Sequence, residues 1–145
     1  MEDNIKQAKH TGEIFFRVDF EGQWYGPDGA EVNEASLFFL TQNLRSDGEG
    51  FFVGMGFGPA KLVVEDVPLH VGGIELVKKG EERHLTMTLV GGAAEALNPE
   101  TLHKRGEHFY CLVRGGRIPA RFVGSALDEL MKYLKVEGED IYLVL

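Results

Sequence analysis

The sequence predicts an α+β fold with mainly antiparallel sheets and two helices. Two kinds of pattern point to it: short segments in which apolar and polar residues alternate, and two stretches in which leucines recur at helical spacing. A third observation is that a hairpin–helix–strand order occurs twice, around 14–55 and 108–145. The helices of the two copies align at an offset of 90 residues and the hairpins at an offset of 94. The fold is therefore expected to be built from a duplicated unit.

The first copy begins with a predicted hairpin over residues 14–25, where short apolar and polar alternations flank a Glu-Gly turn. A helix is predicted over 33–44, with Asn33 as its N-cap and Gly48 as a stop signal. Its apolar stripe consists of Leu37, Leu40 and Leu44. A strand over 51–53 completes the copy.

The second copy has the same predicted order, with a hairpin over 108–120 that turns at Gly115-Gly116. A helix is predicted over 125–134, with Ser125 as N-cap and Gly138 as stop signal. Its stripe consists of Leu127, Leu130 and Leu134. A strand over 141–144 follows.

Between the copies, the sequence has strand character rather than helix character. A strand is predicted over 61–67, and residues 70–78 and 83–90 read as a hairpin around Lys79-Gly80-Glu81. Threonines alternate with three apolar residues in its second strand, which predicts that one face is buried. These residues are Leu85, Met87 and Leu89.

The composition is that of one compact protein. Of its 145 residues, 43% are hydrophobic, which suffices for one core or for two small ones. We expect a flexible, polar segment at 1–12, a first half at 13–58, and a larger second half at 59–145 that includes the central hairpin. No segment has the length of a signal peptide or of a membrane helix, and the single cysteine fits a reducing compartment, so a cytoplasmic location is expected.

The charge is unevenly distributed. The net charge of −8 disfavours broad nucleic-acid binding and binding to acidic membranes, because both partners are anionic. Residues 103–121 are the exception, since five basic residues stand there against Glu107 alone, a local balance of +4 that leaves −12 for the rest. The cations are Lys104, Arg105, Arg114, Arg117 and Arg121.

Several segments resemble the bacterial family described as domain of unknown function 1285. They are the run 20–25, the helix from Asn33, the strand 50–53, the run 61–68, and the stretch 110–120 with its Arg-Gly-Gly turn. The resemblance implies a duplicated core, a C-terminal half loosely like a pleckstrin-homology domain, a ligand site where the halves meet, and a signalling role. Lys61 matches the family pattern, whereas the glutamate that usually precedes it is replaced by Ala60.

The turn at Gly115-Gly116 carries the sharpest chemical prediction. A two-residue turn sets Arg114 and Arg117 opposite each other, with Arg121 and Tyr110 on the same face. Guanidinium groups bind carboxylate or phosphate in two-point geometry, so this face is a candidate anion or nucleotide-phosphate site. The alternative is that the three arginines form ion pairs with the acidic remainder, as most surface charge clusters do.

Two further residues extend this hypothesis. Lys61 and Trp24 are candidates for contacts to the same ligand across the two halves, because an exposed indole can stack on a base. The opposing interpretation is that Trp24 belongs to the core, where large aromatic side chains are commonest. Cys111 lies in an apolar pattern and is read as an inert thiol rather than a redox sensor.

No catalytic motif is present. The five histidines lack metal-ligand spacing and no nucleophile motif occurs, so we expect neither an enzyme nor a cofactor or metal. Two functions are left open. The first is a non-enzymatic, regulatory module that binds a nucleotide-like or other anionic small ligand. The second is a protein–protein interaction module that adds a partner strand to an exposed sheet edge.

Overall fold

The computed structural model describes residues 15–145 and divides into two compact units. The first unit ends at Pro68, and the second runs from Leu69 to Leu145. The segment 1–12, which we expect to be flexible, lies outside the described residues.

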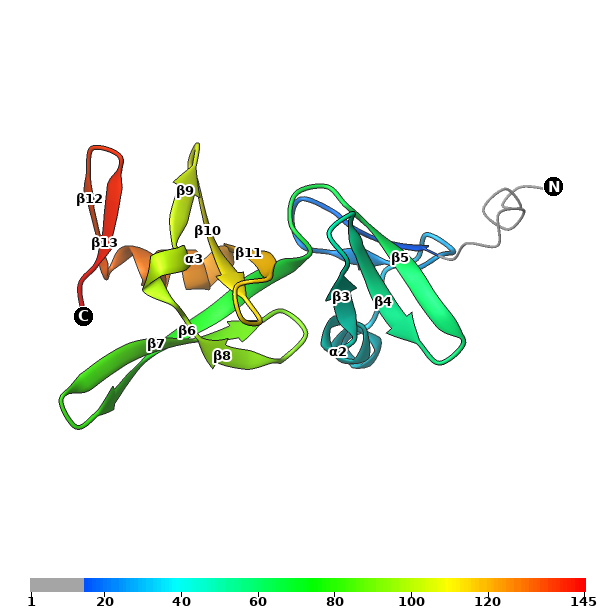
Figure 1. Cartoon of the computed structure of the whole chain (residues 1–145), viewed down its shortest axis with the longest axis horizontal. Helices are drawn as coiled ribbons and strands as arrows, with labels where there is room; N and C mark the ends of the chain where they lie inside the picture. The colour runs from blue at the N-terminus through cyan, green and yellow to red at the C-terminus, as the bar shows by residue number, and fades with distance from the viewer. Residues whose placement is uncertain (1–14) are drawn as a thin grey trace. The chain divides into compact units, whose positions relative to one another are not determined.

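Within residues 15–68, the first unit is a five-stranded sheet with one helix (Figure 1). Its elements are β1 (Phe15–Val18), β2 (Trp24–Tyr25), α2 (Glu34–Gln42), β3 (Leu44–Ser46), β4 (Phe51–Met55) and β5 (Gly58–Val64). The strand order is β2-β1-β5-β4-β3. Strands β1 and β5 are parallel, and the other neighbours are antiparallel. Because β5 pairs with both β1 and β4, residues 59–64 belong to this unit, so the boundary lies later than the 58/59 division expected above.

Alternation along β1 decides which side chains fill the first unit. Phe16 and Val18 are buried, whereas Phe15 and Arg17 point to the opposite, exposed face. Val18 pairs with Trp24 of β2, so the indole shares the inner face and is only 2% exposed. The other buried apolar residues from β3, β4, β5 and α2 are Leu40, Leu44, Val53, Ala60 and Leu62.

The β1–β2 turn is held by Asp19. Its carboxylate accepts hydrogen bonds from the backbone N–H of Gln23 (2.9 Å) and from the hydroxyl of Tyr25 (2.9 Å). Partial burial acts to raise the pKa of Asp19, but these hydrogen bonds outweigh it and hold the pKa below its ordinary value of 3.8. The turn therefore depends on an ionised carboxylate.

We expect Asp19→Asn to lower the free energy of unfolding by about 1 kcal/mol at pH 7. A depressed pKa gives stability that is present above 3.8 and is lost as pH falls through the folded value. The difference between wild type and variant in urea unfolding should therefore shrink below pH 4. An unchanged difference at pH 7 and pH 3 would contradict this role of the carboxylate.

The second unit consists of a six-stranded sheet, one helix and a separate two-stranded hairpin. Its elements are β6 (Leu69–Lys79), β7 (Glu82–Leu89), β8 (Ala94–Ala96), the 3-10 turn η1 (Pro99–Thr101), β9 (His103–Arg105), β10 (His108–Val113), β11 (Ile118–Phe122), α3 (Gly124–Met131), β12 (Leu134–Glu137) and β13 (Asp140–Leu143). The sheet order is β8-β7-β6-β11-β10-β9, and only β11 and β6 pair in parallel among its described strands. Figure 1 shows the β6–β7 hairpin extending away from the body of this unit.

One face of this sheet forms the core, as the alternation predicts. The buried residues of β10 and β11 on that face are Phe109, Cys111, Val113, Ile118, Ala120 and Phe122. Strand β7 adds Leu85, Met87 and Leu89, which are all buried, and this confirms the prediction made from the threonine alternation. Helix α3 contributes Ala126 and Leu130. The α+β class with mainly antiparallel strands is thus confirmed.

The duplicated order is also present. Helix α2 and strands β3 and β4 correspond to α3, β12 and β13 at an offset close to 90 residues. The two copies differ in pairing, because β3 and β4 join the main sheet through β5, whereas β12 and β13 pair, among the described strands, with each other alone. Neither helix within residues 15–145 combines the length and the apolar content needed to cross a membrane.

The ends of both helices differ from the predictions. Asn33 does cap α2, since its side chain accepts from Ser36 N (2.9 Å), but the helix ends at Gln42 and Leu44 begins β3. In the second copy, α3 starts at Gly124 without a side-chain cap, so Ser125 is not the N-cap, and Leu134 lies in β12. Gly48 and Gly138 are turn residues of the following hairpins rather than helix stops.

Candidate functional site

The six predicted site residues lie in both units. Trp24 and Lys61 belong to the first unit, and the four others belong to the second. Trp24 is buried on the inner face of its sheet, so the core interpretation is the one that the structure supports.

Arg114 and Arg117 lie in a turn of four residues between β10 and β11. The last strand pair is Val113 with Ile118, so the register is the one expected, but the two arginines do not pair across a two-residue turn as predicted. The reason is the backbone: Arg114 has φ 54°, and both following glycines are also left-handed.

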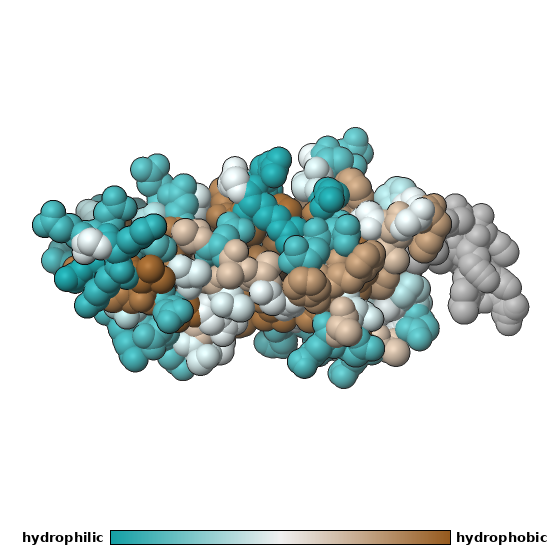
Figure 2. Space-filling model, turned by 90° about the horizontal axis from the view of Figure 1, so that it is seen from below, coloured by the Kyte–Doolittle hydropathy of each residue, from teal (hydrophilic) through white to brown (hydrophobic). Residues whose placement is uncertain are grey.

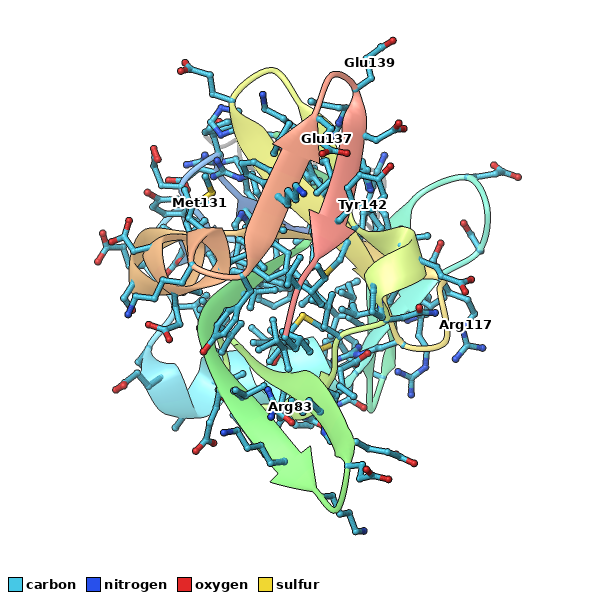
Figure 3. The ribbon with its side chains drawn as sticks, turned by 90° about the vertical axis from the view of Figure 1, so that its left-hand side faces the viewer. Arg83, Arg117, Met131, Glu137, Glu139 and Tyr142 are labelled. Carbon is cyan, nitrogen blue, oxygen red and sulfur yellow. The ribbon has the colours of Figure 1, made fainter. Side chains whose placement is uncertain are left out.

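Each arginine of the turn has a local contact. The backbone N–H of Arg114 donates to the Glu95 carboxylate (3.0 Å), and the Arg117 Nε donates to the carbonyl oxygen of Arg114 (3.0 Å). Figure 3 shows the Arg117 side chain extending outward from the unit. These contacts stabilise the turn rather than form a two-armed anion clamp.

Arg121 lies apart from that turn, in the middle of the sheet face opposite the core. It pairs with Tyr110 of β10 on one side and with His70 of β6 on the other, so the predicted sharing of a face by Arg121 and Tyr110 is confirmed. Arg121 is only 5% exposed, and its Nη1 lies 3.1 Å from His108 Nδ1. Because a guanidinium group can only donate, His108 Nδ1 is the acceptor of this hydrogen bond and carries no proton.

Tyr110 is covered by two side chains of the edge strand β9. The His103 ring stacks on it at 5.5 Å between centroids and 16° between planes, and the Arg105 guanidinium carbon lies 4.2 Å from the Tyr110 ring centroid. Both β9 residues are themselves exposed, whereas Tyr110 is 3% exposed. The ring is therefore a buried platform on which an exposed imidazole and an exposed guanidinium are held.

We name the side chains of this face the basic–aromatic cluster. It consists of His103, Arg105, His108, Tyr110 and Arg121. Sequence reasoning found Tyr110 and Arg121 but missed the other three. Residues 103, 105, 108 and 110 share a face because β9 pairs with β10. The sequence could have shown this only by revealing that pairing, which a polar strand of three residues does not do.

The cluster is chemically suited to an anion. Arg105 offers several N–H donors in a planar fork, and stacking on the phenol ring limits its rotation, so less entropy is lost when it binds. His103 Nδ1 contacts the carbonyl oxygen of Thr101 (2.8 Å), which sets the orientation of that ring. The fixed guanidinium fork of Arg105, beside this oriented imidazole at an exposed edge, can bind the oxygens of a phosphate or a carboxylate.

Lys61 lies on the exposed face of the first unit. The pairing of β3, β4, β5 and β1 places Arg45, Phe52, Lys61 and Phe15 side by side in one row. A cleft of about 500 Å³ opens at this row and at the β3–β4 turn. Among residues 15–145, the Lys61 ammonium makes no hydrogen bond or ion pair.

Cys111 is a buried thiol, as predicted. Its Sγ lies 3.7 Å from Met87 Sδ on the core face. Burial, with a smaller contribution from the Glu95 charge, raises the pKa of Cys111 to about 12. The thiol is therefore protonated at neutral pH, which disfavours a redox-sensing role.

Two solved structures are similar to this chain. One is a DUF1285 family protein from Silicibacter pomeroyi DSS-3, with a TM-score of 0.73 and 21% identity over 90% of this chain and 75% of that one. The other is a DUF1285 family protein from Shewanella baltica OS155, with a TM-score of 0.68 and 14% identity over 81% of this chain and 90% of that one. No family model and no curated protein matches the sequence. The resemblance seen in the sequence is thus confirmed in three dimensions, and the chain has the fold of the DUF1285 family proteins.

Proposed function

We propose that this chain is a non-enzymatic binding module that takes a phosphate-bearing or other anionic small ligand at the basic–aromatic cluster, with a regulatory role. The observation that supports it best is the pair His103 and Arg105, which are exposed and yet fixed on the ring of Tyr110. A freely rotating surface arginine gains little from one ion contact. An arginine that is already held in place loses less side-chain entropy on binding, so more of the free energy of the ion contact contributes to affinity.

The charge distribution supports the same assignment. The excess of +4 over residues 103–121 lies in a chain that is otherwise acidic, so an anion that approaches elsewhere is repelled. The buried Arg121 adds a second guanidinium to the same sheet face, next to Tyr110.

The test compares two neighbouring cations of β9. Arg105→Ala should weaken binding of a phosphorylated ligand at least about tenfold, because it removes the fixed donor fork. Lys104→Ala removes the same charge from the adjacent exposed residue, which points to the opposite side of the strand, and it should weaken binding less than about threefold. Binding is measured by calorimetry with the compound chosen from a thermal-shift screen of nucleotides, inositol phosphates and inorganic phosphate.

The comparison gives separable outcomes. Equal weakening in both variants would mean that only the overall charge attracts the anion, and the site assignment would be wrong. No stabilisation by any phosphorylated compound in the screen would also overturn the proposal. The Arg114 and Arg117 double alanine variant, which removes the turn cations, should retain binding and thereby separates the cluster from the turn.

A second candidate function is recruitment of a protein strand. Strand β6 pairs with β11 only from Leu69 to Val71, and beyond Gly73 it pairs with β7 alone among the described strands. The edge strands β2, β3, β8 and β9 have two or three residues each, and short edges are typical of sheets that avoid strand addition. A partner strand would therefore have to add along the β6–β7 arm.

Hydrogen exchange tests this alternative. Peptides selected from a displayed library against the protein should slow the exchange of backbone amides over 73–79 if they add a strand there. Selected peptides that leave those amides unprotected would rule out strand addition at the arm.

A further inference from the structure

The cleft on the first unit is built from two walls of opposite charge. The β3–β4 turn contributes Asp47 and Glu49, and the sheet contributes Phe52 and Lys61, with Pro59 beside them. Its volume of about 500 Å³ is in the range of sites that enclose small molecules. All of these residues belong to one unit, so the cleft is distinct from the basic–aromatic cluster.

The cationic wall is a lysine set between aromatic rings. Lys61 pairs with Phe52 on one side and with Phe15 on the other, so its aliphatic stem lies between two rings on the exposed sheet face. Phe52 is half-buried, which leaves part of its ring available as an apolar floor. The Lys61 ammonium has no partner among residues 15–145 and is free to bind a carboxylate there.

The acidic wall is held by its own turn. Asp47 Oδ1 accepts hydrogen bonds from the backbone N–H groups of Glu49 (2.9 Å) and Gly50 (3.2 Å). This contact fixes the loop, while the Glu49 carboxylate makes no hydrogen bond or ion pair within the described part of the chain. Neither acidic residue forms an ion pair with Lys61, although all three line the same cleft.

We infer that this cleft binds a small zwitterion with an apolar side chain, such as an apolar amino acid or a dipeptide of one. The carboxylate of the ligand binds Lys61, its ammonium binds Glu49 and Asp47, and its apolar part lies on Phe52 and Pro59. Opposite charges held apart across a cleft are complementary to a molecule that carries both charges at a fixed separation.

Other ligand classes fit the cleft less well. A phosphate or a nucleotide meets two carboxylates on the β3–β4 turn, and a simple cation meets the Lys61 ammonium. An uncharged apolar molecule leaves both walls without a counter-charge. Only a ligand with one group of each sign satisfies both walls.

The test uses one dipeptide and its capped forms. Phenylalanylglycine, its N-acetyl derivative and its C-terminal amide are titrated into ¹⁵N-labelled protein at pH 7, and chemical shifts are followed over residues 45–62. We expect saturable shifts with the free dipeptide and at least about tenfold weaker binding of each capped form, since each lacks one charge contact.

Two variants assign each end of the ligand to a wall. Lys61→Met should weaken the free dipeptide about tenfold and leave the affinity for the C-terminal amide unchanged, because the lost partner was the carboxylate. Glu49→Gln should do the same for the N-acetyl derivative. The matched controls are Lys78→Met and Glu82→Gln, which change exposed residues of the second unit. Both variants should bind all three compounds with the affinity of the wild type.

Three results would overturn the inference. They are the absence of saturable shifts over 45–62, equal affinity for free and capped forms, and an effect of Lys61→Met that is the same for the dipeptide and its amide. Inorganic phosphate is titrated in parallel, and its shifts are expected over 103–121 instead. Failure of one titration therefore leaves the other interpretable.

Discussion

Replacement of Trp24 by alanine should lower the free energy of unfolding of the first unit by about 3–5 kcal/mol, the usual cost of removing a buried large aromatic side chain. The indole is 2% exposed and pairs with Val18 on the inner face of the sheet. Such a loss is a large share of the stability of a small domain. We therefore expect the first unit of this variant to be largely unfolded at 37 °C.

The matched control is Phe57→Ala. Phe57 lies at the β4–β5 turn of the same unit and is 69% exposed, so its removal should change the free energy of unfolding by less than about 0.5 kcal/mol. Because Trp24 is the single tryptophan, unfolding in urea is followed by circular dichroism rather than by fluorescence. If Trp24→Ala were as stable as Phe57→Ala but lost ligand binding, the stacking interpretation would be correct and the core interpretation wrong.

The first unit also carries exposed aromatic side chains, so the stability of a core variant has to be compared with that of a surface variant. Helix α2 has no single apolar stripe, and Phe38 and Phe39 are each about half exposed, at 51% and 49%. Figure 2 views the molecule from the side of this helix and shows apolar surface over it. Composition alone cannot tell such residues from the buried indole, because both are large and apolar.

The faces of the longer strands could be predicted from the sequence. In β7, apolar residues alternate with threonines over residues 85–89, and burial follows that alternation. A period of two is a direct consequence of the pleat, so it survives whatever the tertiary context is. The register of the β10–β11 hairpin followed from its predicted turn at Gly115-Gly116, which places Val113 opposite Ile118.

The helix ends and the short strands could not be predicted. Leu44 and Leu134 continue the leucine spacing of the preceding helices, yet both begin strands. In the first copy the Asn43 side chain donates to the carbonyl oxygen of Phe39 and closes the helix early, a local contact that periodicity does not report. Strands of three or four residues carry too few positions for a period to be recognised.

The candidate sites show the same division. Arg121 and Tyr110 could be placed on one face because the turn of a hairpin fixes which residues of its two strands pair. The pairing of Arg114 with Arg117 was predicted wrongly, because the length of a turn depends on backbone angles that the sequence does not specify. The contact of Arg105 with Tyr110 arises from the pairing of β9 with β10, two strands joined by a turn at Gly106. The sequence shows only Gly106 at this position. The structure shows that this glycine has φ 62° and forms the turn.

Cys111 should react with thiol reagents at least about a thousandfold more slowly in the native protein than in urea. A rise in pKa from 9.0 to about 12 lowers the thiolate fraction at pH 8 by about three orders of magnitude, and the thiolate is the reacting species. The side chain is also fully buried, so the reagent cannot reach it without opening of the second unit. The rate of labelling with iodoacetamide then reports how often that unit opens.

A cysteine at an exposed position provides the control. Ser125→Cys in a Cys111→Ala background places a thiol at the exposed start of α3, and it should be labelled in the native state nearly as fast as in urea. Native labelling of Cys111 at the rate of that control would contradict the burial and the raised pKa. A second contact that opening of this unit would break is formed by Arg83, which lies on the β6–β7 hairpin (Figure 3). Its Nη1 donates to the Leu145 carbonyl oxygen (3.0 Å).

The raised pKa also fixes the sign of a pH dependence. An acid whose folded pKa exceeds its unfolded pKa stabilises the fold below the unfolded value, and this stabilisation is lost as pH rises through that value toward the folded one. For Cys111 the window runs from about 9 to about 12. At pH 10 the wild type should have lost about 1–1.5 kcal/mol relative to pH 8 beyond the loss seen in Cys111→Ala, because only the unfolded thiol ionises. Equal losses in the two proteins would show that the thiol is solvated in the native state.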